Sequence, residues 1–338
     1  MSDAAPVAVD APTSAPATPR AIVETRDLTR RYGETLALDH LNLTIPEGAI
    51  FGFIGPNGAG KTTTMRILTT LLQPSSGEAR VAGISVRDQP KEVRKVVGFM
   101  PDFFGVYDNM KAWEYLDFFG RAYGVPANRR TTLIDELLAL VDLSHKRDDY
   151  VMGLSRGMSQ RLSLARTMIH DPQLLILDEP ASGLDPRARI ELRELLKELR
   201  ALGKTIMISS HILTELAEMC THIAIIEHGK LLAAGDVQSI LRSLQPHRTL
   251  EIRILQGAEQ AQALLRELPE VLALREAPEQ DRAPGDTATL LLVDFTGDEA
   301  QMGELLARLI GQGVLITRFA EQAGNLEDIF MQVTKGVI

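Results

Sequence analysis

One stretch decides the fold of this chain: Gly55-Pro56-Asn57-Gly58-Ala59-Gly60-Lys61-Thr62-Thr63. It fits the pattern Gly-x-x-x-x-Gly-Lys-Ser/Thr. The apolar run at residues 49–54 precedes it and predicts a buried strand. After it, apolar residues at helical spacing predict a helix whose inner face is formed by Met65, Leu68, Leu71 and Leu72. A strand, a glycine-rich loop and a helix in this order are typical of a phosphate-binding loop.

The chemistry of such a loop follows from its backbone. Glycines let successive N–H groups turn toward one anion, and the N-terminus of the next helix adds its positive end. Lys61 then reaches the β- and γ-phosphates of a nucleotide, and the Thr62 hydroxyl binds Mg²⁺. The alternative is a glycine turn that precedes a helix by chance, which roughly a few per cent of chains this long would contain.

Composition excludes several classes of protein. The chain has 338 residues, enough for two or three domains. Its net charge of −9, with no long basic run, argues against a general nucleic-acid binder. The one cysteine, Cys220, excludes an internal disulfide and fits a reducing compartment. No apolar stretch approaches the roughly 18 residues of a membrane span, and no signal-peptide pattern is present. We therefore expect a soluble chain that serves a membrane only through a partner.

The segments before and after the loop have distinct patterns. Residues 1–20 lack apolar periodicity and predict a disordered tail. Residues 21–54 predict short strands, with 41–45 alternating as one half-buried strand. The part from about 103 to 170 is mostly helical in pattern, and its apolar residues are interpreted as core or interface, including Trp113, Leu116, Phe118 and Phe119.

A second candidate group of site residues follows the apolar run 174–177, which ends in Asp178-Glu179. Two carboxylates after a buried strand are costly unless they meet a cation or water at the sheet edge. Asp178 is the candidate for the Mg²⁺ shell, and Glu179 is the candidate to orient and deprotonate the attacking water. The alternative is an ordinary strand end.

Four single residues add to the prediction. Ser155 predicts a helix N-cap, as does Asp185 before Pro186. His211 follows the predicted strand 205–209, where a parallel strand delivers side chains to a ligand crevice. Tyr32 lies in a polar turn, where its ring could stack on adenine or be partly buried without a role. A purely structural role is the alternative for each.

The C-terminal part, residues 246–338, has a different pattern. The order β-α-β-β-α-β predicts a small ferredoxin-like α+β domain, followed by a short helix from Asn325. Residues 280–286 predict a polar loop. We find no catalytic constellation there and expect a regulatory or dimerisation domain.

These motifs, in this order and spacing, resemble the ATP-binding subunit of an ABC transporter over residues 22 to about 240. The loop and Asp178-Glu179 resemble the Walker elements. Residues 154–158, Leu-Ser-Arg-Gly-Met, resemble the signature motif through Ser155 and Gly157. Residues 182–185 resemble the D-loop, which includes Asp185, while His211 resembles the switch histidine and Tyr32 the adenine-stacking ring.

Two positions depart from the family pattern. Arg156 replaces a signature glycine, and Asp102 replaces the glutamine that follows the core strand. In the family that glutamine contacts Mg²⁺ or the attacking water and relays the nucleotide state to the membrane partner. Asp102 could join the Mg²⁺ shell, or it could turn to a cation on the partner.

The resemblance implies a fold, a reaction and partners. The fold is an α/β P-loop NTPase core at residues 21–245, with antiparallel β and helical subdomains. The reaction is ATP hydrolysis with Mg²⁺, with Lys61, Glu179 and His211 as catalytic groups. Two subunits, a homodimer or a pair of paralogues, would face head to tail with each ATP between one loop and the other's signature motif. A separate membrane permease would be driven from the cytoplasmic face of the inner membrane, without nucleic acid.

The class of ABC protein is inferred from the sequences of three segments. The loop, the signature and residues 325–330, Asn-Leu-Glu-Asp-Ile-Phe, resemble ATPases of the ABC-2 export class, which serve drug, polysaccharide, lipid or ion efflux. The alternatives are an importer subunit, an ABC ATPase that acts on DNA or ribosomes, and a catalytically weak interaction module.

Overall fold

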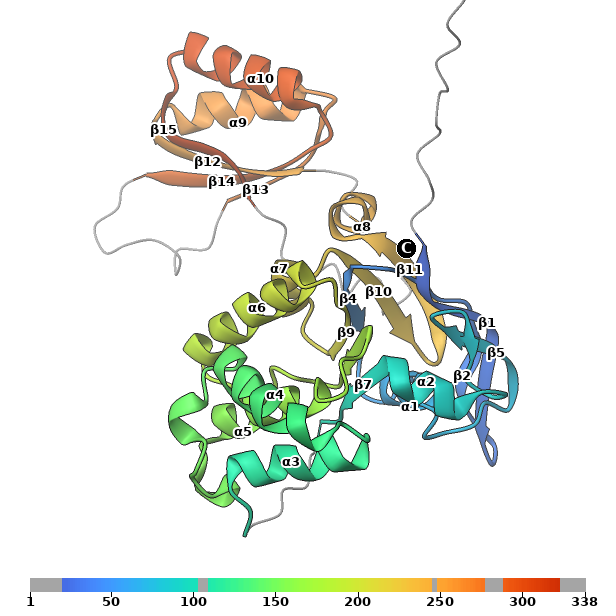
Figure 1. Ribbon diagram of the computed structural model, residues 1–338. Helices are drawn as coiled ribbons and strands as arrows, with labels where there is room; N and C mark the ends of the chain where they lie inside the picture. Colours follow the sequence, from blue (N-terminus) through green and yellow to red (C-terminus); the bar gives the residue numbers. More distant parts are fainter. Residues whose placement is uncertain (1–19, 103–108, 245–247, 277–287, 323–338) are drawn as a thin grey trace, which may run out of the picture.

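The computed structural model describes residues 20–102, 109–244, 248–276 and 288–322. These residues form three sheets with helices between and around them (Figure 1). The sequence predictions for the tail at residues 1–19, the loop at 280–286 and the helix from Asn325 lie outside the described residues.

The central sheet carries the candidate site. Its strand order is β11-β10-β4-β9-β8-β7, and all neighbours are parallel except the β10–β11 pair. The strands are β4 (Ile50–Ile54), β7 (Val97–Met100), β8 (Leu174–Leu177), β9 (Thr205–Ser210), β10 (His222–Glu227) and β11 (Lys230–Asp236). Because β4, β7, β8 and β9 run parallel, the residues that follow them all emerge at one edge of the sheet.

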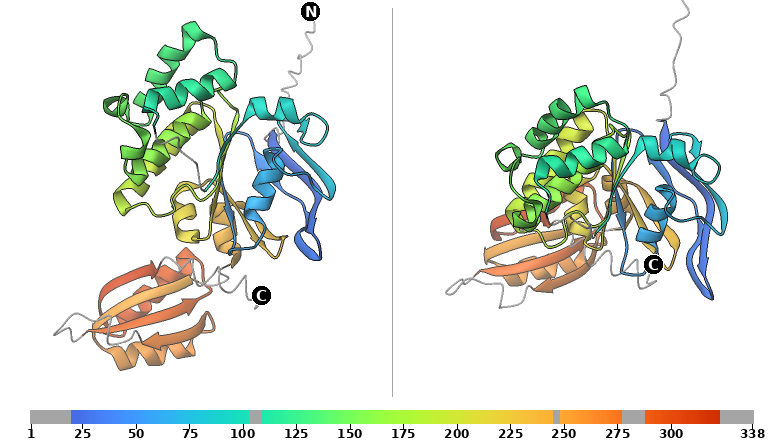
Figure 2. Two further views of the ribbon diagram at one scale, coloured as in Figure 1. Left: turned by 90° about the horizontal axis from the view of Figure 1, so that it is seen from below. Right: turned by 60° about the horizontal axis from the view of Figure 1, so that its bottom comes forward.

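Both faces of this sheet are buried, which explains why β4 and β8 are continuously apolar and why every residue of β9 is buried. Alternate residues point to opposite faces. Ile50 and Ile54 join the apolar cluster that includes the helical region, whereas Phe51 and Phe53 join the cluster that includes the antiparallel sheet. Figure 2 shows these two parts on opposite sides of the central sheet. The helices that accompany the sheet are α1 (Lys61–Leu68), α2 (Pro90–Val96), α6 (Pro186–Ala201), α7 (Leu213–Met219) and α8 (Val237–Leu244).

The antiparallel sheet has the order β2-β1-β5-β6, with β3 paired to β1. Its strands are β1 (Ala21–Tyr32), β2 (Thr35–Leu41), β3 (Thr44–Pro46), β5 (Ser76–Val81) and β6 (Ile84–Ser85). The single strand predicted at 41–45 is two strands, because the Asn42 side-chain oxygen accepts the Asp27 N–H (2.9 Å) at the break. The predicted alternation of buried and exposed side chains is nevertheless present across residues 41–45.

The helical part lies beside β7 and consists of α3 (Ala112–Ala122), α4 (Ala127–Leu140), η1 (Ser144–Lys146), η2 (Val151–Gly153) and α5 (Arg156–Thr167). Leu116 and Leu162 are buried there, as a core role requires. One apolar prediction is wrong. Leu71 is 64% exposed because α1 ends at Leu68, so it cannot share a helix face with Met65. Phe118 is 42% exposed on α3, so of the two roles predicted for it, core or interface, the core role does not apply.

The C-terminal part has the predicted β-α-β-β-α-β order. The elements are β12 (Arg248–Gln256), α9 (Ala258–Glu267), β13 (Val271–Glu276), β14 (Thr289–Phe295), α10 (Glu299–Gly311) and β15 (Leu315–Gln322). The antiparallel strand order β13-β14-β12-β15 is that of a ferredoxin-like fold. Both helices cover one face of the sheet (Figure 1) and share with it a separate apolar cluster that includes Ile252, Leu265 and Leu309.

Among the helices of the described residues, none has the length and apolar character that a membrane span requires.

Candidate functional site

The glycine-rich loop joins β4 to α1 at the carboxyl edge of the central sheet. Gly58 and Gly60 have positive φ values of +82° and +108°, which favour glycine. A Cβ atom on Gly60 would lie 2.7 Å from the Ala37 carbonyl oxygen, and one on Gly55 would collide with the Ile226 carbonyl oxygen. The loop is therefore held closely against β2 and β10. No side chain caps α1 at Gly60, so its first N–H groups are available to an anion.

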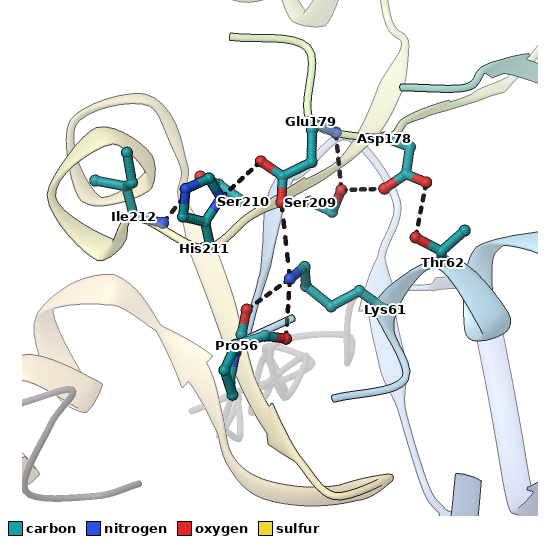
Figure 3. Close-up of polar contacts among 10 residues, drawn as sticks. Pro56, Lys61, Thr62, Asp178, Glu179, Ser209, Ser210, His211 and Ile212 are labelled. Atoms are coloured by element: carbon teal, nitrogen blue, oxygen red, sulfur yellow. Dashed lines mark hydrogen bonds and ion pairs between the residues drawn. The ribbon is translucent and has the colours of Figure 1, made fainter. Parts of the chain in front are cut away.

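Lys61 is buried and folds back over the loop. Its Nζ donates to the carbonyl oxygens of Gly55 (2.5 Å) and Pro56 (3.3 Å), and it lies 3.7 Å from Glu179 Oε1 (Figure 3). Burial lowers the pKa of Lys61, and the nearby Glu179 and Asp178 carboxylates oppose that shift. An incoming phosphate would offer this cation a stronger acceptor than the two carbonyl groups do.

Asp178 is 3% exposed and is bound by two hydroxyl groups from opposite sides. Thr62 Oγ1 donates to its Oδ2 (3.0 Å), and Ser209 Oγ donates to its Oδ1 (2.6 Å). Its N–H donates to the Met100 carbonyl oxygen (2.8 Å), which places the end of β7 beside it. A threonine hydroxyl and a carboxylate in contact are the hard oxygen donors that Mg²⁺ prefers.

Glu179 joins the loop to β9. One of its carboxylate oxygens faces Lys61 and the other lies 3.1 Å from His211 Nδ1. Its backbone has φ +50°, and its N–H donates to Ser209 Oγ (2.9 Å). Burial raises the pKa of Glu179, while Lys61 and His211 act in the opposite direction. A raised pKa beside a cation is suited to a group that must accept a proton from water.

The structure thus brings together Lys61, Thr62, Asp178, Glu179 and His211 (Figure 3). Within the described ranges, no cluster of three or more His, Cys, Asp or Glu side chains could hold a metal by itself. Mg²⁺ in nucleotide sites commonly binds to one or two carboxylates, waters and substrate phosphates.

Two other predicted residues lie outside this cluster. Tyr32 ends β1 and is 44% exposed, with the Arg30 guanidinium 4.6 Å from its ring centroid. Asp102 is exposed two residues beyond the end of β7. In the described part of the chain, no hydrogen bond or ion pair joins Asp102 to another residue.

The resemblance to the signature motif and D-loop falls on a second surface. Ser155 caps α5 and accepts the Met158 N–H (3.4 Å), and Asp185 caps α6 and accepts the Ala188 N–H (2.8 Å), as predicted. Ser155, Gly157 and Asp185 line one hollow together. Across the described residues, no hydrogen bond or ion pair links this hollow to Lys61 or Glu179. The Arg156 side chain lies against Gly183, where any Cβ would collide with it.

Sequence reasoning missed Ser209. It treated residues 205–209 only as a strand that leads to His211, yet the Ser209 hydroxyl contacts both Asp178 and Glu179. Two serines at the end of a buried strand, directly after the apolar residues 206–208, were the available signal.

Comparison with known proteins adds the family context. The family model described as ABC transporter matches residues 38–182, and an AAA domain model matches residues 150–217. A Nod factor export ATP-binding protein of Cupriavidus metallidurans is 34% identical, covering 93% of this chain and 97% of that protein. A bacitracin transport ATP-binding protein of Bacillus licheniformis is 33% identical over 93% of this chain and 98% of that one.

Solved structures agree with the fold. A structure described as the ATP-binding subunit of an ABC transporter is 29% identical with a TM-score of 0.60, covering 66% of this chain and 92% of its own. A Clostridium perfringens protein described as part of an ABC transporter complex is 24% identical, with a TM-score of 0.60 and coverage of 74% and 96%.

Proposed function

Because this chain belongs to the ABC transporter family of ATP-binding subunits, we propose that it is the ATPase subunit of an exporter and drives a separate membrane permease. One observation carries the proposal: Glu179, which follows β8, lies 3.7 Å from Lys61 of the glycine-rich loop and 3.1 Å from His211, which follows β9. The relatives' names favour export over an importer and over an ATPase that acts on DNA or ribosomes.

In this proposal the chain's own residues do the following work. The loop's N–H groups and Lys61 bind the phosphates of ATP, and Thr62 with Asp178 holds Mg²⁺. When bound, Mg²⁺ neutralises charge that develops on the phosphates. Glu179 accepts the proton of the attacking water, and His211 orients the Glu179 carboxylate from its other side.

The remaining site residues support a proposal about assembly. Ser155, Gly157 and Asp185 line one hollow, and within the described part of the chain no hydrogen bond or ion pair joins that hollow to Lys61. We therefore assign them to the ATP held by a second subunit, either another copy or a close paralogue. Tyr32 is exposed and is assigned to the adenine ring. The permease would then be reached from the cytoplasmic face of the inner membrane. In this proposal the permease selects the cargo, which is a drug, a polysaccharide, a lipid or an ion.

The test is the change Glu179→Gln, with Glu198→Gln on the exposed side of α6 as the control. We expect Glu179→Gln to bind ATP and to hydrolyse it at least about a hundredfold more slowly, the scale of a lost general base. Steady-state ATPase and equilibrium ATP binding measure this. Normal turnover in Glu179→Gln would remove Glu179 from the role. A wild-type protein that neither binds nor hydrolyses ATP would overturn the function, and co-purification with a permease from membranes tests the partner.

A further inference from the structure

Ser209 lies at the next-to-last position of β9 and is completely buried. Its hydroxyl makes two hydrogen bonds across to the end of β8 (Figure 3). It donates to Asp178 Oδ1 at 2.6 Å and accepts the Glu179 N–H at 2.9 Å. One side chain from a neighbouring strand therefore contacts both acidic residues of the site.

The first of these bonds determines how the Asp178 carboxylate is turned. Asp178 is 3% exposed, so water does not compete for its oxygens. Ser209 occupies Oδ1, which leaves Oδ2 facing Thr62 on the side of the glycine-rich loop. The Ser209 bond thus fixes the rotation of the carboxylate, with one oxygen bound to Ser209 and the other on the metal-binding side.

The second bond determines the direction in which the chain leaves β8. Glu179 has φ +50°, a conformation that side chains other than glycine rarely adopt, so surrounding contacts must hold it. Its N–H is held by Ser209 and its carbonyl oxygen by the Ser182 N–H (3.0 Å). In this conformation its carboxylate reaches both Lys61 and His211.

We propose that Ser209 is the positioning residue for both carboxylates: it turns Asp178 Oδ2 toward the metal side and fixes the backbone that aims Glu179. This inference rests on the proposed function. Ser209 has no part in the chemistry itself. The segment 209–211, at the end of β9 and just after it, then holds Glu179 at two points: Ser209 contacts the backbone and His211 contacts the side chain.

The neighbouring residue provides a matched control. Ser210 is also buried, at 4% exposure, but its hydroxyl accepts the Ile212 N–H (3.0 Å) and contacts neither carboxylate. The two serines differ mainly in which side of β9 they face. A defect that follows Ser209 and spares Ser210 is therefore a property of the carboxylate contacts and not of strand β9 in general.

The experiment measures binding of a fluorescent ATP analogue to the full-length protein against Mg²⁺, together with ATPase kinetics. In Ser209→Ala we expect the Mg²⁺ midpoint for binding to rise about tenfold and kcat to fall about tenfold or more, the effect of losing buried hydrogen bonds to a charged group. KM for ATP at saturating Mg²⁺ should change little. Ser210→Ala should resemble the wild type, and Ser209→Thr, which keeps a hydroxyl, should recover much of both losses.

Thermal unfolding without nucleotide or Mg²⁺ separates a structural role from a positioning role. A Ser209→Ala protein that is less stable, but has the wild-type Mg²⁺ midpoint and kcat, would overturn the proposal. If Ser209→Ala does not fold, Ser209→Cys takes its place in the experiment, since a thiol is only a weak donor. A Ser209→Cys protein with the wild-type Mg²⁺ midpoint would also overturn the proposal. If the wild type binds Mg²⁺-ATP while Ser209→Ala and Ser210→Ala behave alike, this inference alone fails. A wild type that binds none overturns both it and the proposed function.

Discussion

At the scale of single residues, Glu179 is the group whose environment most directly affects the reaction. Burial raises its pKa, and Lys61 and His211 counteract part of that shift. A general base works as the ionised carboxylate. The rate of hydrolysis should therefore be maximal above the pKa of Glu179. It should fall as the pH drops through that pKa, which is higher than the pKa of an ordinary glutamate.

This pH dependence can be tested with His211→Ala. Removing His211 takes away an influence that lowers the Glu179 pKa, so the acid limb of kcat should move to higher pH. His40→Ala, an exposed histidine on β2, serves as the control and should leave the limb in place. An acid limb that stays in place, or moves to lower pH, in His211→Ala would contradict the assignment.

At Asp102 the chain differs from the glutamine that the resemblance to ABC ATP-binding subunits implies. A carboxylate about 5 Å from a γ-phosphate oxygen would be repelled by roughly 3 kcal/mol per charge pair at an effective dielectric near 20. Mg²⁺ between the two would remove that conflict. We propose that Asp102, exposed at the end of β7, joins the Mg²⁺ shell when the dimer closes.

The corresponding change is Asp102→Asn. It should raise the Mg²⁺ concentration for half-maximal ATPase and weaken coupling to transport, while ATP affinity in the open state stays near normal. A titration of ATPase against Mg²⁺ decides this. An unchanged midpoint would leave the alternative, in which Asp102 turns outward to a cation on the membrane partner.

At the scale of elements, the N-terminus of α5 tests the assembly. Ser155 caps this helix, and among the residues that the structure describes no hydrogen bond joins it to the loop of its own subunit. Mixing Lys61→Ala subunits with Ser155→Arg subunits leaves one composite site intact in each heterodimer. We expect ATPase to be partly recovered from two inactive parents. Heterodimers that form, as shown by differential tags, and yet remain inactive would argue against sites shared between subunits.

At the scale of the whole molecule, the C-terminal sheet has a core of its own, with helices α9 and α10 on one face. We propose the division into an ATP-binding domain at 21–245 and a C-terminal domain at 246–338 that serves dimer contact or regulation. A protein that ends at residue 246 should keep ATP binding but change its dimerisation or its ATPase control. Sedimentation measures dimerisation, and ATPase assays measure control of hydrolysis. If the shortened protein behaves like the full-length protein in both assays, the C-terminal domain has another purpose.

Sequence patterns predicted most elements because the signals are local. The apolar runs of β4, β8 and β9, the N-caps Ser155 and Asp185, and the ferredoxin-like strand order are all confirmed. One error occurred where a distant contact decides: the strand at 41–45 is interrupted where Asn42 binds Asp27. The other is local, because Leu71 follows the helical spacing but lies beyond the end of α1 at Leu68.

The sequence by itself determined which chemistry is available, because a glycine-rich loop with Lys61 and an acidic pair after an apolar strand are defined by local spacing. Only the tertiary structure decided how these groups meet. The parallel register of β8 and β9, with Leu177 opposite Ile208, brings Ser209 to Asp178 although they are 31 positions apart. Burial at that edge raises the Glu179 pKa, and packing holds Glu179 at positive φ. Register and burial arise from contacts between distant segments, so no local pattern encodes them.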